Sequence, residues 1–88
     1  MDKTIYTTEY QTVLELLKEL RHEAGISQVE LADQLQQSQS FVSKYERGDR
    51  RLDIVQVRTI CQQLGTTLSV FVENLENRLA STTRRRKK

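Results

Sequence analysis

Apolar residues recur at the spacing of an α-helix along almost the whole chain, and this spacing constrains the fold more than any other feature. The first example is a stripe at positions i, i+3, i+4 and i+7 that consists of Tyr10, Val13, Leu14, Leu17 and Leu20. Such a stripe marks the buried face of an amphipathic helix. The alternation typical of strands is absent, and the sequence contains no proline. We therefore predict an all-α protein.

Capping signals divide this pattern into five helices. Thr8 with Gln11, and Ser27 with Glu30, have the spacing of a capping box at a helix N-terminus. Glycine, which often ends a helix in the left-handed conformation, follows three of the segments. The predicted helices run from Thr8 to about Gly25, from Gln28 to Leu35, from the N-cap Ser38 to Gly48, from about Asp53 to Gly65, and from Thr67 or Ser69 to about Ala80.

The last two predicted helices have apolar faces, and that of the fifth is wider than a small core needs. The fourth should bury Ile54, Val57, Ile60, Cys61 and Leu64, and the fifth carries Leu68, Phe71, Val72, Leu75 and Leu79. We expect part of the fifth helix to cover a second subunit. The candidates for this homodimer interface are Phe71, Val72, Leu75 and Leu79.

Length and composition favour one small domain without catalytic chemistry. The 88 residues are 36% hydrophobic and 30% charged, which is ordinary for a globular chain. We find no nucleophile–base pair and no phosphate-binding glycine loop, and His22 has no second ligand at zinc spacing. No apolar run approaches the roughly 18 residues of a membrane span, and the single cysteine, Cys61, cannot form an internal disulfide. We expect a cytoplasmic protein that is not an enzyme and needs no cofactor, metal or membrane.

Charge is distributed unevenly along the chain. Residues 1–40 carry three basic and seven acidic side chains, whereas residues 41–58 carry five basic and three acidic ones. Another five of the 14 basic residues occupy positions 84–88. We therefore expect an N-terminal arm at residues 1–7, a domain at residues 8–80, and a basic, disordered tail at residues 81–88. The tail either solubilises the protein or lies along the phosphates of a nucleic acid. The basic segment at residues 41–58 suits an anionic partner.

The second and third predicted helices are short and lie close together in the sequence. Two short helices joined by a three-residue turn cross steeply, as in a helix-turn-helix. The outer face of the third helix is polar and consists of Gln39, Ser40, Ser43, Lys44 and Arg47. Glutamine can make a two-pronged contact with adenine, serine can donate or accept, and lysine can reach guanine or a phosphate. This face is therefore predicted to read base edges of double-stranded DNA.

Contacts to the DNA backbone are predicted around the same helix. Ser38 caps its N-terminus, where free N–H groups favour a nearby phosphate. Arg47, Arg50 and Arg51 lie at its C-terminal end and just beyond, and we expect them to lie along the sugar–phosphate backbone.

The stretch AGISQVELADQLQQSQSFVSKYERGDRRLD resembles the Cro/phage-repressor (XRE-like) helix-turn-helix family over about residues 10–75. The resemblance implies a five-helix, lambda-repressor-like fold. It implies that Gln28 contacts the DNA backbone, that Gln39, Ser40 and Lys44 enter the major groove, and that Arg21 pairs with Glu46. The chain departs from the family at Gln36, where the turn usually has a glycine, and a non-glycine residue there costs roughly 1 kcal/mol.

Two classes of function remain open at this point. The first is a sequence-specific regulator of transcription that binds double-stranded DNA, more specifically a repressor, and acts as a homodimer because one short helix reads few bases. The second is a protein-interaction module, such as the antitoxin of a toxin–antitoxin pair. Its protein partner would bind the acidic first helix and the long fifth helix.

Overall fold

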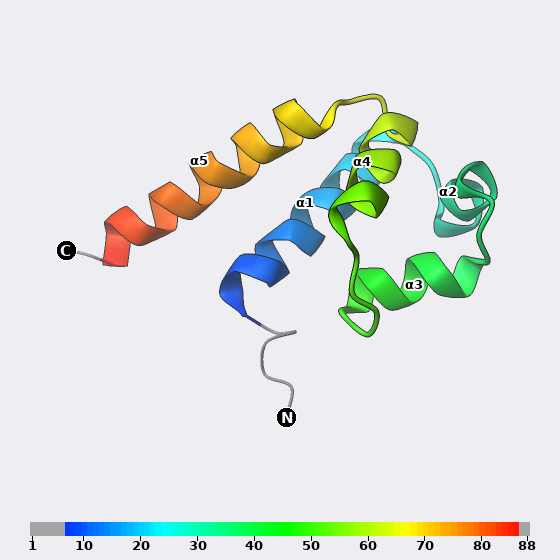
Figure 1. The fold of residues 1–88 in the computed structure, drawn as a ribbon, viewed down its shortest axis with the longest axis horizontal. Coiled ribbons are helices and arrows are strands. Elements are labelled where there is room, and N and C mark those ends of the chain that lie inside the picture. Colours follow the sequence, from blue (N-terminus) through cyan, green and yellow to red (C-terminus); the bar gives the residue numbers. More distant parts are fainter. Residues whose placement is uncertain (1–6, 87–88) are drawn as a thin grey trace.

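The structure, a computed structural model, describes residues 7–86 of the chain, with side chains described for residues 7–81. Within this range the elements are all helices, as predicted, and short connections join them (Figure 1). The five helices are α1 (Thr8–Ala24), α2 (Gln28–Leu35), α3 (Gln39–Arg47), α4 (Ile54–Gln63) and α5 (Leu68–Arg86).

Local capping explains why most helices begin where the sequence predicted. Ser27 and Glu30 form the predicted capping box of α2, and the Ser38 side chain caps α3 by accepting from the Phe41 N–H. α1 begins at Thr8, but its N-cap is Thr7, whose hydroxyl accepts the Tyr10 N–H at 3.1 Å. The capping box predicted from Thr8 is therefore wrong by one residue, because two adjacent threonines offer the same chemistry.

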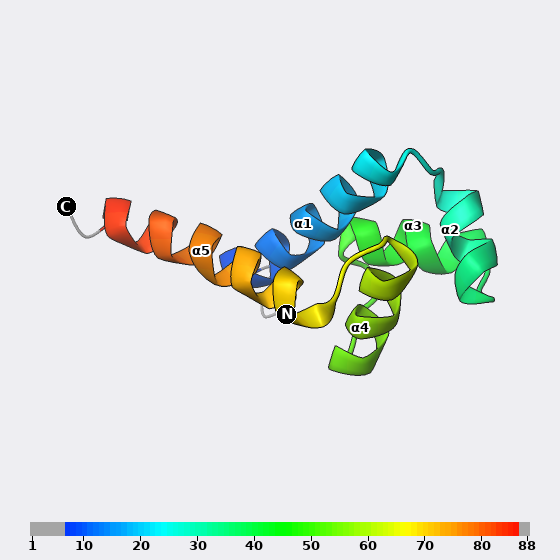
Figure 2. The same cartoon turned by 90° about the horizontal axis from the view of Figure 1, so that it is seen from above.

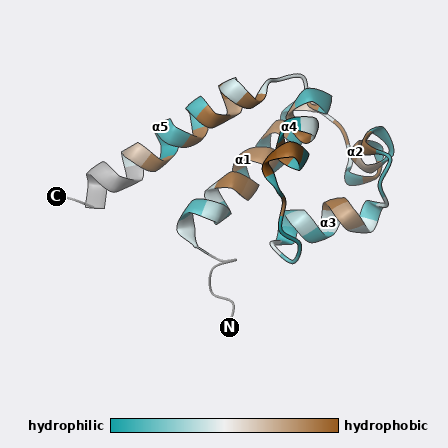
Figure 3. Ribbon diagram, in the orientation of Figure 1, coloured by the Kyte–Doolittle hydropathy of each residue, from teal (hydrophilic) through white to brown (hydrophobic). Residues whose placement is uncertain are grey.

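The core lies where α1, α2, α3 and α4 meet. Its largest fully buried side chains are Tyr45, Leu17, Leu31, Ile60, Val42 and Cys61. Figure 3 shows how α3 contributes, with a hydrophobic middle segment between hydrophilic ends. The prediction that Ile54 is buried was wrong, because this side chain is 62% exposed. Ile54 is the first residue of α4, and that end of α4 projects away from the other helices (Figure 2).

Helix α5 packs against the domain through its first half and then extends away from it (Figures 1 and 2). Phe71 is buried, and Leu68 and Leu75 pack at the edge of the core. α5 continues to Arg86, past Ala80 where the sequence predicted that order ends. Residues 81–86 contain no proline or glycine, and arginine is a good helix former, so α5 continues through them. Residues 87–88 of the predicted tail, and nearly all of the predicted arm, lie outside the described residues.

Across residues 7–86, none of the helices is both long enough and apolar enough to span a membrane.

Candidate nucleic-acid interface

Helices α2 and α3 form a helix-turn-helix. Gln36 ends α2 in the left-handed conformation, with φ 59° and ψ 41°. The Gln36 N–H donates to the Asp33 carbonyl at 3.1 Å, and the Gln37 N–H donates to the Ala32 carbonyl at 2.9 Å. These bonds close the helix end in the way that a glycine usually permits. The turn therefore has the geometry expected of the motif, and the missing glycine leaves strain at Gln36.

Helix α3 has one buried face and one exposed face. Phe41, Val42 and Tyr45 are buried, and Phe41 packs edge-on against Tyr45 with ring centroids 5.6 Å apart. The side chains of Gln39, Ser40 and Lys44 are exposed, as is that of Ser38 at the N-cap, while Ser43 is half-buried. The residues that were predicted to read bases therefore share the face of α3 that the rest of the domain leaves uncovered.

A buried ion pair joins α1 to the C-terminal half of α3. The Arg21 Nε donates to Glu46 Oε2 at 2.7 Å, and its Nη2 donates to Oε1 at 3.1 Å. Only 9% of the Arg21 side chain and 3% of the Glu46 side chain are exposed. Arg21 also donates to the Ile26 carbonyl at 2.9 Å, which ties down the chain between α1 and α2. The structure thus contains the pair that the family resemblance implied, and it fixes the orientation of α3.

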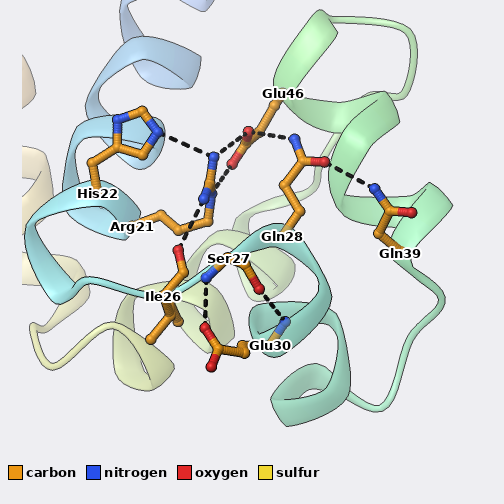
Figure 4. A network of polar contacts seen from close by, with 8 residues as sticks. All are labelled: Arg21, His22, Ile26, Ser27, Gln28, Glu30, Gln39 and Glu46. Atoms are coloured by element: carbon orange, nitrogen blue, oxygen red, sulfur yellow. Dashed lines mark hydrogen bonds and ion pairs between the residues drawn. The ribbon is translucent and has the colours of Figure 1, made fainter.

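Gln28 connects this ion pair to the exposed face of α3 (Figure 4). Its Nε2 donates to Glu46 Oε1 at 2.9 Å, and its Oε1 accepts from Gln39 Nε2 at 3.0 Å. The chain Arg21–Glu46–Gln28–Gln39 therefore runs from the protein interior to the surface. Sequence reasoning assigned Gln28 a contact with the DNA backbone and did not predict this bridge. The i to i+11 spacing of two glutamines across the turn was the one available signal.

The arginines at the C-terminal end of α3 and in the loop after it each contact a neighbouring side chain. Arg47 donates to Asp49 Oδ2 at 2.9 Å and to the Ser43 hydroxyl at 2.8 Å. The Arg50 guanidinium lies 5.0 Å from the centroid of the Phe41 ring, and that of Arg51 lies 5.1 Å from the Tyr10 ring. Stacking on a ring orients a guanidinium and leaves its charge in place.

Tyr10 also holds the loop that carries these arginines. Its hydroxyl accepts the Leu52 N–H at 3.2 Å, which attaches the connection between α3 and α4 to α1. Sequence reasoning treated Tyr10 only as part of an apolar stripe. Its phenolic oxygen was the signal that it could also bond the backbone.

Two buried groups of the core, the Tyr45 hydroxyl and the Cys61 thiol, have raised pKa values. Burial, with a further contribution from the Glu46 carboxylate, raises the pKa of the Tyr45 hydroxyl well above its usual range. Burial also raises the pKa of the Cys61 thiol, so neither group ionises near neutral pH. Among the described side chains, no group of three histidine, cysteine, aspartate or glutamate residues could hold a metal ion.

The candidates for a dimer interface do not all lie on one surface. Phe71 is 3% exposed and belongs to the monomer core. Val72 is 39% exposed, and Leu75 and Leu79 are half-buried. These last three, rather than Phe71, are accessible to a second molecule.

Comparison with known proteins assigns this architecture to a class. The sequence profile of the family described as "Helix-turn-helix" matches residues 17–71, which include all of α2, α3 and α4. A solved structure described as an XRE-family like protein from Pseudomonas syringae pv. tomato str. DC3000 is similar to this chain, with a TM-score of 0.78 and 45% identity. The similarity covers 85% of this chain and 92% of that one.

A second solved structure shows the same fold at lower identity. It is the clp gene regulator ClgR from Corynebacterium glutamicum, with a TM-score of 0.75 and 18% identity over 92% of this chain and 86% of that one. No curated protein sequence matches the chain. The chain is thus a helix-turn-helix protein of the class of DNA-binding transcriptional regulators. Within that class it belongs to the XRE family.

Proposed function

We propose that the protein is a sequence-specific repressor that binds double-stranded DNA as a homodimer and places α3 in the major groove. The observation that carries this proposal is the exposed polar face of α3 on a helix whose orientation is fixed from within. Gln39 and Lys44 are exposed, while the buried Arg21–Glu46 pair holds the helix beneath them. Because α3 is already held in place, less conformational entropy is lost when its side chains contact a base.

Gln39 is the residue best placed to select a base. One of its N–H groups is engaged by Gln28, which leaves its Oε1 and a second N–H for a ligand. An amide that presents one acceptor and one donor matches the N6 and N7 edge of adenine. Because Gln28 limits its rotation, Gln39 should discriminate more sharply than a freely rotating glutamine. Lys44, five residues further along α3, suits guanine or a phosphate.

Arg47, Arg50 and Arg51 supply the contacts that do not depend on sequence. Their positive charges lie at the end of α3 and in the loop that follows, so they can follow the phosphates on one side of the groove. Asp49 neutralises part of the charge of Arg47. We therefore expect Arg50 and Arg51 to contribute more than Arg47 to the dependence of binding on salt.

The accessible part of α5 supports the homodimer in this proposal. Val72, Leu75 and Leu79 present apolar surface next to a polar one, which suits a second subunit. Two copies would read two half-sites about one helical turn apart, which supplies the specificity that one short helix lacks.

Selection of bound duplexes from a random DNA pool tests the proposal. A palindrome with adenine in each half-site is expected. Gln39→Ala and Lys44→Ala should each weaken binding to the selected site by about 1–3 kcal/mol and leave binding to random DNA almost unchanged. Arg51→Ala should weaken binding to both and lower the salt slope by about one unit.

Gln62→Ala, at an exposed position on α4, is the matched control and should bind like the wild type. If the pool yields no consensus, and all binding disappears above low salt, the DNA-reading proposal is wrong. Tight capture of a protein partner would then favour the interaction-module alternative.

A further inference from the structure

We propose that Tyr10, in the first turn of α1, is a positioning residue for DNA binding. It holds the loop that carries Arg51 in the place from which this arginine reaches a phosphate, and it does not itself contact DNA. The proposal rests on the DNA binding proposed above and assigns part of it to a helix turn outside the helix-turn-helix. Tyr10 precedes residues 17–71, the part of the chain that matches the family profile, so that match gives it no role.

Two groups of the Tyr10 side chain contact two successive residues of the loop. The ring centroid lies 5.1 Å from the guanidinium of Arg51, and the hydroxyl accepts the Leu52 N–H at 3.2 Å. Tyr10 and Leu52 are both half-buried and pack against the core, whereas Arg51 is exposed. The tyrosine therefore anchors the backbone at Leu52 and orients the side chain of the preceding residue. The guanidinium keeps its charge and remains accessible to an anion.

The two ends of this loop are fixed by their own helices. The Asp49 N–H donates to a carbonyl in the last turn of α3 at 2.8 Å. At the other end, Asp53 and Gln56 form the capping box of α4, with bonds of 2.8 and 2.9 Å. Residues 50–52 lie between these anchors, where Tyr10 supplies the contacts from α1. Loss of Tyr10 should therefore loosen the middle of the loop and leave both helices in place.

The position of Tyr10 is itself fixed, because α1 is held at both ends. The Thr7 hydroxyl caps the Tyr10 N–H at 3.1 Å, and the buried pair of Arg21 and Glu46 joins the other end of α1 to α3. α1 thus holds α3 through one contact and the loop after α3 through another. This keeps the arginine of the loop at a fixed distance from the exposed face of α3. A loop that is already ordered loses less conformational entropy when it meets a phosphate.

Removing this support should weaken a phosphate contact without changing base recognition. Ordering one long side chain on binding costs the equivalent of about 2- to 12-fold in affinity. We expect Tyr10→Leu to weaken binding to the selected site and to random DNA by the same factor within about this range. Tyr10→Phe keeps the ring and loses only the hydroxyl, so its affinity should lie between those of Tyr10→Leu and the wild type.

Leu20→Ala is the matched control for a loss of packing on α1. Leu20 is also half-buried and packs against the core, but it lies near the other end of the helix. This variant should bind DNA like the wild type. Far-UV circular dichroism establishes that each variant is folded at the temperature of the binding assay.

A double variant separates positioning from a general loss of stability. If Tyr10 acts through Arg51, adding Tyr10→Leu to Arg51→Ala should weaken binding by less than about twofold further. Amide hydrogen exchange gives a readout that needs no DNA. The Leu52 amide should exchange about 2- to 12-fold faster in Tyr10→Phe than in the wild type, as expected for one lost hydrogen bond. The Thr66 amide, in the connection between α4 and α5, is the control and should be unchanged.

Wild-type affinity in Tyr10→Leu would overturn the positioning role and leave the proposed function standing. A loss in the double variant equal to the sum of the two single losses would do the same. A loss confined to the selected site would also overturn it, because Tyr10 would then support base recognition. A wild type that binds no DNA would refute the proposed function and this role with it, while exchange at Leu52 would still report whether Tyr10 anchors the loop.

Discussion

The buried pair of Arg21 and Glu46 allows the sharpest prediction about stability. Glu46 accepts two bonds from Arg21 and one from Gln28, and its side chain is 3% exposed. Replacing Glu46 with leucine leaves the Arg21 charge buried without its counter-ion. Losing one partner of such a pair costs about 3–5 kcal/mol. A chain of this length is expected to have a free energy of unfolding of roughly 4–13 kcal/mol, so the loss is severe.

A double-mutant cycle separates the ion pair from simple loss of packing. Arg21→Met alone should also cost about 3–5 kcal/mol, because it leaves the Glu46 carboxylate buried and unpaired. The double variant Arg21→Met/Glu46→Leu contains no buried charge. It should lose only about 2–3 kcal/mol, since the hydrogen bonds to Gln28 and the Ile26 carbonyl are still missing. The two changes should therefore be coupled by at least about 3 kcal/mol.

Urea denaturation followed by far-UV circular dichroism measures each corner of the cycle. Thermal denaturation gives a second measurement. The melting temperature shifts by about 4–8 °C per kcal/mol, so each single variant should melt at least about 12 °C below the wild type. The two residues are not a tightly coupled buried pair if each single variant lowers the free energy of unfolding by less than about 1 kcal/mol. The same conclusion follows if the loss in the double variant equals the sum of the two single losses.

Three further predictions concern other parts of the chain. Gln36→Gly should raise the free energy of unfolding by about 0.5–1 kcal/mol because it relieves the left-handed strain, and a loss in chemical denaturation would contradict this. The Cys61 thiol should react with iodoacetamide at pH 8 far more slowly in the folded protein than in urea, because it is buried with a raised pKa; equal rates by mass spectrometry would show that it is accessible. Hydrogen bonding from Arg78 lowers the pKa of Glu19, so this pair contributes stability above the ordinary carboxyl pKa of about 4.3 and loses it as pH falls through the lowered value. The contribution should stay under about 1 kcal/mol because both groups are substantially exposed, and Glu19→Gln should remove this part of the acid-side dependence in pH-dependent melts.

Features that depend on neighbouring residues in the sequence were predictable. The Ser27 and Ser38 caps and the Gly48 helix end follow from local hydrogen bonding and backbone conformation, so the motif could be placed before the structure was known. The exposed face of α3 followed from the same helical spacing that identified its buried face. The two-threonine sequence at the start of α1 was ambiguous because both residues can cap a helix.

Features that depend on how helices cross were not predictable from spacing alone. The bond between Gln28 and Gln39 requires the angle between α2 and α3, and the bond from the Leu52 N–H to Tyr10 joins residues 42 positions apart. Ile54 has the spacing of an inner residue, yet its side chain, at the first position of α4, is 62% exposed. Periodicity reports which side of a helix is apolar and does not report where the surrounding elements end.

The claim that α3 lies in the major groove can be tested most directly by dimethyl sulfate footprinting of the selected DNA site. The reagent methylates guanine N7 in the major groove and adenine N3 in the minor groove, so one experiment reports both surfaces. If α3 lies in the major groove, the bound protein protects guanine N7 within each half-site and leaves adenine N3 reactive at the same positions. Protection of adenine N3 with guanine N7 still fully reactive would contradict it.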